Sequence, residues 1–234
     1  MDLFSFALLT PYEWSALRLS FQVAVCAALA GLPLAVAIGY FLARTDFPGK
    51  WLLEALIHLP LVLPPVVTGY LLLILFAPRG PIGAVLSGVF GVKIVFTWWA
   101  AVLASLVVSF PLMVRAIRLA FQGVDPRLEM AARSLGASRL GAFFSISLPL
   151  ARRGLVAGWL LAFARSLGEF GATIMVSSNV QGQRTIPLEI YSLKSQTDGI
   201  EQCWRLVVLS ILLACAALAV SELLERKQSR HESA

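Results

Sequence analysis

DPRLEMAARSLGASRLGAFFSISLP, residues 125–149, is a polar-flanked stretch in a chain that is otherwise rich in apolar residues. Asp, Arg and Glu side chains are concentrated in its first half, so this stretch does not fit a lipid interior. Asp125 suits the N-cap of a helix, and Pro126 suits the first helical position, where its missing N–H costs nothing. We therefore expect a helix to begin here, between two apolar segments.

The residues that follow carry the spacing of a short amphipathic helix. An apolar stripe recurs at i, i+3, i+4 and i+7, formed by Leu128, Ala131, Ala132 and Leu135. Two members of the stripe are alanines, so a partner could approach that face closely. Gly136 suits a left-handed C-cap, and a second short helix is expected to begin at Ser138 and to end before Pro149.

Two interpretations of this amphipathic stretch remain open from the periodicity alone. In the first, the helix lies in the membrane interface with its arginines at headgroup level. In the second, the stretch is a rigid docking element that fits into a groove of a soluble partner and transmits that partner's motion to the flanking spans.

Composition indicates one integral membrane domain. The chain has 234 residues, of which 59% are hydrophobic and 14% charged, and its mean hydropathy is +0.82, whereas soluble domains carry about 25% charged residues. The net charge of +6 is typical of positive cytoplasmic loops. No basic cluster with interleaved aromatic residues suggests nucleic-acid binding, and the three isolated cysteines indicate neither a disulfide framework nor a metal site.

Five apolar segments predict an all-α protein with about five transmembrane helices. We expect an N-terminal interfacial segment at 1–14, a transmembrane domain at 15–225 and a cytoplasmic tail at 226–234. The expected spans are 17–43, 52–76, 94–118, 153–177 and 204–224, and the polar residues 177–205 are expected to form an external loop.

Three prolines, Pro60, Pro64 and Pro65, are expected to break the second span, and carbonyls freed at that depth need protein or a water-filled cavity around them. In the fourth span, Gly154 and Gly158 form a G-x-x-x-G step that permits close helix contact.

Charge distribution predicts the orientation in the membrane. Lys and Arg are more numerous on the side that holds residues 125–149 and the C-terminus. That side should be cytoplasmic, which leaves the N-terminus outside. The first basic residue is Arg18, so a cleaved signal peptide is not expected.

Arg165 and Glu169 lie four residues apart inside the fourth expected span. Charges are costly there and usually face a partner or water. One interpretation is a structural i,i+4 ion pair that neutralises itself. The other places both side chains along the substrate path or at a subunit contact.

The motifs of several enzyme classes are absent from the sequence. The only Gly-Lys pair, Gly49-Lys50, is followed by Trp51, so there is no P-loop, and neither H-E-x-x-H nor G-x-S-x-G occurs. We therefore expect no enzymatic activity, no cofactor and no metal in this chain. An ion-coupled secondary transporter that uses Arg165 and Glu169 remains an alternative.

The polar stretch resembles the cytoplasmic EAA loop of ABC importer permeases. Gly136, Ile146, Leu148 and Pro149 match the G-x9-I-x-L-P half of that loop, and Ala131 and Ala132 match its alanines. One position departs from the pattern: the glutamate usually lies six residues before the glycine, where this chain has Met130, and the acidic residue is Glu129.

Three further segments resemble the molybdate ABC transporter permeases: HLPLVLPPVVTGYLLL (His58–Leu73), SFPLMVRAIRLAF (Ser109–Phe121) and FARSLGEFGATI (Phe163–Ile174). The similarity extends over roughly residues 12–225. It implies the type I ABC importer permease fold in a bacterial-type cytoplasmic (inner) membrane. It also implies a substrate, molybdate or tungstate, with the sulfate and thiosulfate permeases as the second candidate family.

The resemblance further implies partners and a coupling site. The partners are a second copy of the chain, two ABC ATPase subunits, and a periplasmic or lipid-anchored oxyanion-binding protein. The implied coupling residues are Leu128, Glu129, Ala131, Ala132, Leu135, Gly136, Ile146, Leu148 and Pro149.

Overall fold

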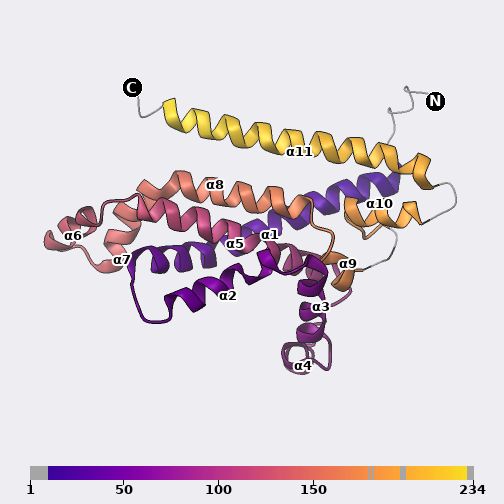
Figure 1. Cartoon of the computed structure of the whole chain (residues 1–234), viewed down its shortest axis with the longest axis horizontal. Helices are drawn as coiled ribbons and strands as arrows, with labels where there is room; N and C mark the ends of the chain where they lie inside the picture. Colours follow the sequence, from indigo (N-terminus) through magenta and orange to yellow (C-terminus); the bar gives the residue numbers. More distant parts are fainter. Residues whose placement is uncertain (1–9, 179, 181, 196–198, 231–234) are drawn as a thin grey trace.

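The computed structural model describes residues 10–178, 180, 182–195 and 199–230, and within this part of the chain it is helical, without strands. Its elements follow one another as α1 (Pro11–Arg44), α2 (Lys50–Val62), α3 (Pro65–Phe76), α4 (Pro81–Val89), α5 (Trp98–Gln122), α6 (Pro126–Ser134), α7 (Arg139–Ala142), the π-helix η2 (Phe143–Ser147), α8 (Leu148–Leu167), α9 (Thr173–Val176), α10 (Ile186–Lys194) and α11 (Gly199–Arg230). Figure 1 shows α6 and α7 at one end of the bundle and α9 and α10 at the other.

The core is formed by α1, α5 and α8. On α1 the buried residues include Ala24, Ala28 and Ala35, which lie on one face of the helix and leave room for a neighbouring backbone. α5 contributes larger side chains to the same core, such as Ile117 and Phe121. α11 lies against α8 and α10 and runs along the outside of this group (Figure 1).

The predicted close contact at Gly154 and Gly158 is confirmed. A Cβ atom on Gly154 would lie 2.1 Å from the Cβ of Ala120, and one on Gly158 would lie 3.2 Å from the carbonyl oxygen of Met113. The first distance is too short for any Cβ atom, and the second is tighter than most contacts that real Cβ atoms make. The glycines therefore bring α8 directly against α5.

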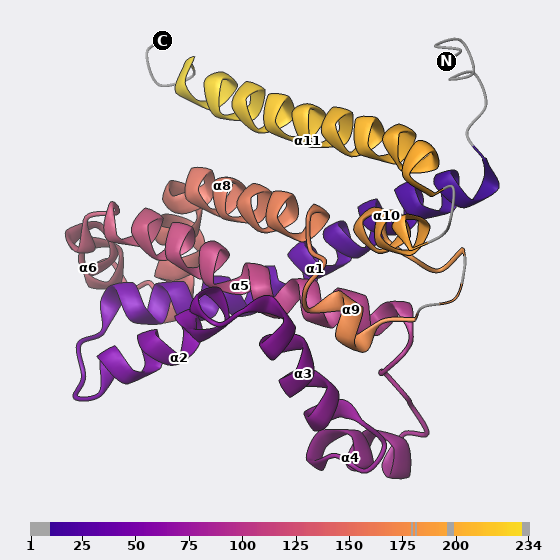
Figure 2. The ribbon, with the colours of Figure 1, turned by 45° about the vertical axis from the view of Figure 1, so that its right-hand side comes forward.

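Three helices among the described residues are long and apolar enough to cross a membrane: Pro11–Arg44, Trp98–Gln122 and Arg139–Leu167. A fourth candidate is the pair α2 and α3, which is bent by 111°. Figure 2 shows α3 turning away from α2 and carrying α4 outward from the bundle. The fifth expected span corresponds to α11, whose apolar part, Cys203–Ala217, is shorter.

The bend in the second span falls at Leu63 and Pro64, both of which have extended backbone angles. The expectation that Pro60 also breaks this span is wrong, because Pro60 lies inside α2. A proline disfavours the helical conformation of the residue before it. Pro65 acts in this way on Pro64, and Pro64 acts on Leu63, so two consecutive residues leave the helix.

The expectation that the helix after Ser138 ends before Pro149 is also wrong. α7, η2 and α8 form one continuous helix through Pro149. The N–H of Leu148 donates to the carbonyl of Phe143, five residues back. The π turn before Pro149 widens the helix, and this accommodates a ring that has no N–H to donate.

The ends of several elements differ from the sequence prediction. α1 begins at Pro11, earlier than the expected span, because Thr10 and Glu13 form a capping box; residues 1–9 of the expected interfacial segment 1–14 lie outside the described residues. α11 continues to Arg230, into the expected tail, and residues 231–234 are likewise not described.

The segment 177–205, expected to be a loop, contains α10. The N–H of Ile186, at the start of α10, donates a hydrogen bond to Ser20 Oγ on α1.

The contact between α5 and α8 yields a test by substitution. Gly154→Ala places a methyl group against Ala120, and overpacking of this kind typically costs about 1–3 kcal/mol. We expect a lower melting temperature of the purified protein in detergent, and we expect Ala120→Gly in the same chain to restore it. Gly168→Ala is the matched control, because a Cβ there meets nothing within 4 Å. Equal melting temperatures for G154A and G168A would contradict the proposed contact.

Candidate functional site

The polar end of the bundle is built around α6. The Oδ1 atom of Asp125 accepts a hydrogen bond from the N–H of Arg127 at 2.9 Å, so Asp125 is the N-cap, as the sequence predicts. At the other end, Gly136 has φ +95°, the left-handed conformation that glycine adopts without strain. The N–H of Gly136 donates to Arg133 and that of Ala137 to Ala132, which is the hydrogen-bond pattern of a Schellman motif.

The apolar stripe of α6 faces a hollow at the surface of the chain. This hollow, of about 510 Å³, lies between α6 and the start of α8. Its lining includes six of the residues that the sequence singled out: Leu128, Ala131, Ala132, Leu135, Ile146 and Pro149. Leu135 is 91% exposed, which is unusual for a leucine at the end of an amphipathic helix. The stripe is therefore open at the surface of the chain.

Glu129 lies on another side of α6 and is directed toward the bundle. Its Oε2 accepts a hydrogen bond from Tyr40 Oη at 2.9 Å, and its Oε1 accepts one from Ser147. Arg44 forms an ion pair with Oε1, with Nη2 at 3.0 Å. The carboxylate therefore joins α6 to the end of α1 and to η2.

The surroundings of Glu129 favour its charged form. Burial raises the pKa of this carboxyl group, but the hydrogen bonds from Ser147 and Tyr40 and the positive charge of Arg44 outweigh burial and hold the pKa below its ordinary value. The group is therefore ionised at neutral pH, and it fixes α6 through charge-assisted hydrogen bonds.

The structure divides the predicted coupling residues between two faces. The six that line the hollow are on the open face, whereas Glu129 and Leu148 point to the interior, where Leu148 packs against the core. The sequence analysis did not single out Tyr40, Arg44 or Ser147. Tyr40 and Arg44 lie 89 and 85 residues from Glu129 in the chain, and no local pattern connects them with it.

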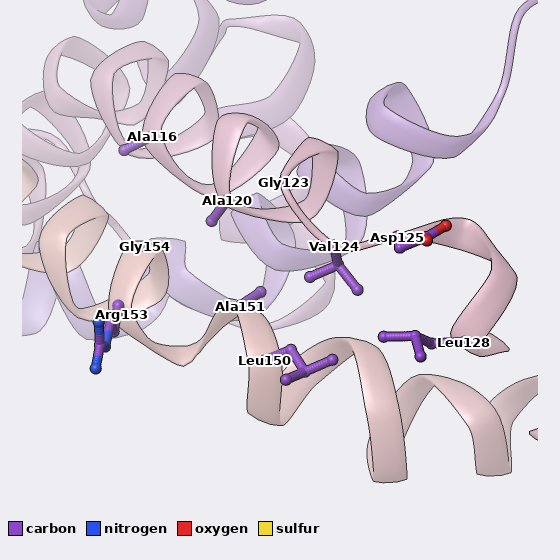
Figure 3. Close-up of a pocket in the computed structure, with 10 residues that line it drawn as sticks. All are labelled: Ala116, Ala120, Gly123, Val124, Asp125, Leu128, Leu150, Ala151, Arg153 and Gly154. Atoms are coloured by element: carbon purple, nitrogen blue, oxygen red, sulfur yellow. The ribbon is translucent and has the colours of Figure 1, made fainter. Parts of the chain in front are cut away.

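A second hollow, of about 610 Å³, lies where α5 ends and α8 begins. Figure 3 shows Val124, Leu128 and Leu150 converging on the gap between these helices and α6. Ala120 and Gly154 form its narrow part, at the helix contact described above. Leu128 lines both hollows, so α6 borders the space at the end of the α5–α8 contact.

Arg165 and Glu169 form the ion pair that their spacing suggests, with Nη1 and Oε2 2.7 Å apart. α8 ends at Leu167, so the pair bridges the helix end and the following turn rather than lying within one span. Glu169 is buried, and its Oε1 also accepts the N–H of Ala172 at 2.8 Å. Ala172 in turn contacts Gly69 on α3, because a Cβ on Gly69 would lie 2.5 Å from the Ala172 carbonyl oxygen. The pair thus supports the turn against which the bent span packs.

Replacement of Glu129 tests the attachment of α6. Glu129→Gln keeps the shape of the side chain but leaves Arg44 without its counter-charge, and hydrogen bonds to charged groups contribute about 1.5–3 kcal/mol. We expect amide hydrogen exchange in α6 to become roughly tenfold faster or more. Asp46→Asn is the control, since Asp46 is fully exposed in its ion pair with Lys50. Exchange in α6 that is unchanged in E129Q would argue against this role.

The lowered pKa of Glu129 also predicts a dependence on pH. A group whose pKa is lower in the folded protein contributes stability above its unfolded value, and this stability is lost as the pH falls through the folded value. We therefore expect slow exchange in α6, corrected for the intrinsic rate, to persist from neutral pH down to about pH 4.3, the ordinary value for Glu, and to be lost below it. Loss of protection already between pH 7 and pH 6 would contradict the assignment to Glu129.

Comparison with known proteins places this architecture in a family. The sequence profile of the family described as "Binding-protein-dependent transport system inner membrane component" matches residues 35–230. The chain is 53% identical over 220 residues to the molybdenum transport system permease protein ModB of Escherichia coli, covering 94% of this chain and 96% of that protein. It is 38% identical over 182 residues to the molybdate/tungstate transport system permease protein WtpB of Thermococcus kodakarensis, covering 78% of this chain and 68% of that protein.

Solved structures show the same fold at lower identity. A chain of an amino acid ABC transporter superposes with a TM-score of 0.67 at 21% identity, covering 97% of this chain and 99% of that chain. A chain of a bacterial alginate ABC transporter, in complex with an alginate-bound periplasmic protein, gives 0.74 at 14% identity, covering 97% and 83%. The fold is therefore that of the type I ABC importer permeases, and the chain belongs to the family of binding-protein-dependent transport system inner membrane components.

Proposed function

We propose that this chain is the membrane-spanning permease subunit of an ATP-driven importer for molybdate, with tungstate as a second substrate. The observation that carries the proposal is the 53% identity to a molybdenum permease along nearly the whole chain. The relative from Thermococcus kodakarensis, whose name includes both oxyanions, supports the same substrate class. The sulfate and thiosulfate alternative, and the ion-coupled carrier, have no comparable support.

ATP hydrolysis is assigned to a separate subunit that docks on α6. The open hollow beside α6, with its two alanines and the exposed Leu135, supports this assignment. The cap at Asp125 and the Schellman motif at Gly136 make α6 a rigid unit. Movement of α6 would pass to α1 through Glu129 and to α8 through the continuous helix that begins at α7. The change between inward-facing and outward-facing states is then a rigid-body change driven by contacts that differ between the states.

The chain is proposed to work as a homodimer that encloses the pathway. None of the residues of α2 is buried within the chain, and its exposed side chains include Trp51, Leu56 and Val62. An apolar face of this kind is suited to a second copy, and closed twofold symmetry is the most common arrangement of oligomers.

A periplasmic or lipid-anchored binding protein would deliver the oxyanion at the α10 end. The N-terminus is placed outside and the C-terminus in the cytoplasm of an inner membrane.

Substitution of Gly136 tests the docking role. Gly136→Val imposes a β-branched side chain on φ +95°, and the left-handed conformation costs an ordinary residue about 1–2 kcal/mol. We expect a protein that still inserts and whose complex still hydrolyses ATP, with molybdate uptake reduced roughly tenfold or more. Gly136→Asn is the control, since Asn tolerates this backbone conformation. Wild-type uptake by G136V would count against the docking role.

Purification from the native membrane tests the assembly as a whole. We expect two copies of this chain with two ATPase subunits, and molybdate uptake by vesicles should stop when ATP is depleted. An ion-coupled carrier predicts the reverse result, namely uptake that survives ATP depletion and collapses with the ion gradient. A complex that takes up sulfate but not molybdate would replace the proposed substrate with the alternative.

A further inference from the structure

A third hollow, of about 910 Å³, lies between the last turns of α1 and the helix formed by α7, η2 and the start of α8. Its walls are mainly apolar and include Val36 and Ala37 from α1 and Phe143 and Phe144 from η2. Phe144 is exposed, so the hollow opens to the surroundings of the chain. This hollow is separate from the two that lie beside α5 and the stripe of α6.

The polarity of the hollow changes along α1. Its apolar wall begins at Leu32, and the guanidinium groups of Arg44, Arg133 and Arg139 lie at its other end. Leu32 and Arg44 are twelve positions apart on one helix, which corresponds to roughly 18 Å at 1.5 Å per residue. The hydrocarbon of one leaflet is about 15 Å thick, half of the whole core. The hollow therefore has the length and the polarity of one leaflet.

Two of the three arginines are available to an anion. Arg44 is neutralised by Glu129 in the ion pair described above. Arg133 and Arg139 are exposed, and neither forms an ion pair with a carboxylate among the residues that the structure describes. Arg133 lies in the last turn of α6 and Arg139 in the first of α7, on either side of Gly136. One bound phosphate could thus connect both helices of the polar end.

We propose that this hollow binds an anionic phospholipid of the surrounding membrane. Arg133 and Arg139 hold its headgroup phosphate, and one acyl chain lies along Leu32, Val36 and Ala37 of α1. The apolar side chains of a second protein would satisfy the walls but would supply no counter-charge to the two arginines, whereas an anionic phospholipid satisfies both ends. The assignment to the cytoplasmic leaflet rests on the orientation under the proposed function; the site itself rests on the geometry alone.

The bound lipid would have a structural role in coupling. Glu129 joins α6 to α1 from within the protein, and the lipid would join α6, α7 and α1 from the outside. The membrane would therefore complete the attachment of the polar end. Anionic lipid would slow amide exchange in α6 and α7, and this effect does not require transport to be measured.

The test uses the full-length purified protein and two lipids, phosphatidylglycerol and phosphatidylcholine. Retention of each lipid is measured by native mass spectrometry, and affinity is measured by titration of lipid into delipidated protein. We expect phosphatidylglycerol to bind more tightly, and the double variant R133Q/R139Q to lose roughly 30-fold in affinity for it. Arg127→Gln, an exposed arginine of α6 that does not line the hollow, is the matched control and should bind normally.

A second pair of variants tests the acyl chain separately from the charge. Ala37→Trp fills the apolar wall and leaves all three arginines in place, so it should also reduce phosphatidylglycerol binding. Leu34→Trp, which lies in a different hollow beside Leu56 and Phe110, should not. Both variants are compared with the wild type for melting temperature without lipid, so that misfolding is recognised.

Several results would overturn the proposal. Equal binding of the two lipids would exclude recognition of the negative charge. Equal losses in R127Q and R133Q/R139Q would reduce the site to a general attraction between charges. Normal binding by A37W, or full competition by inorganic phosphate, would exclude a seated acyl chain. Phosphatidylglycerol that is expelled when a second copy or an ATPase subunit docks would assign the hollow to that protein. Failure of molybdate uptake would bear on the proposed function and would leave these binding results unchanged.

Discussion

The close contact between α5 and α8 at Ala120 and Gly154 sets the spacing of the two helices from which the polar end of the bundle extends. α6 follows α5, and α8 continues the helix formed by α7 and η2. The polar end of the bundle is therefore attached at both of its ends to helices that contact each other. If these helices stood further apart, the hollow that Leu128 borders would widen, and α7 and η2, against which α6 packs, would shift with α8. Close helix contact through small residues is the usual means of association where water gives no hydrophobic driving force.

Glu129 provides the second support, and it changes the role that this acidic residue is expected to have. A glutamate near the EAA position would be expected to face the partner, whereas here it points inward to Tyr40, Arg44 and Ser147. The exposed stripe of α6 is left apolar. Under the proposed function, the stripe would serve recognition and the carboxylate would serve force transmission.

Local features of this site were accessible from the sequence because their causes are local. The cap at Asp125, the left-handed Gly136 and the pair Arg165–Glu169 each depend on neighbours within four residues. The partners of Glu129 are distant in the chain and become visible only when α1 packs beside α6. The three prolines of the second span looked equivalent, but only the adjacent pair, Pro64 and Pro65, interrupts the helix.

The π turn at Phe143–Ser147 has a geometric consequence for α8. A hydrogen bond that spans five residues accommodates one more residue per turn than the α register does. Since each residue of an α-helix advances by about 100° around the axis, this extra residue rotates all later side chains by roughly that angle relative to α7. Gly154 faces α5 only in the rotated setting. The π turn thus helps to direct the glycine face of α8 toward α5.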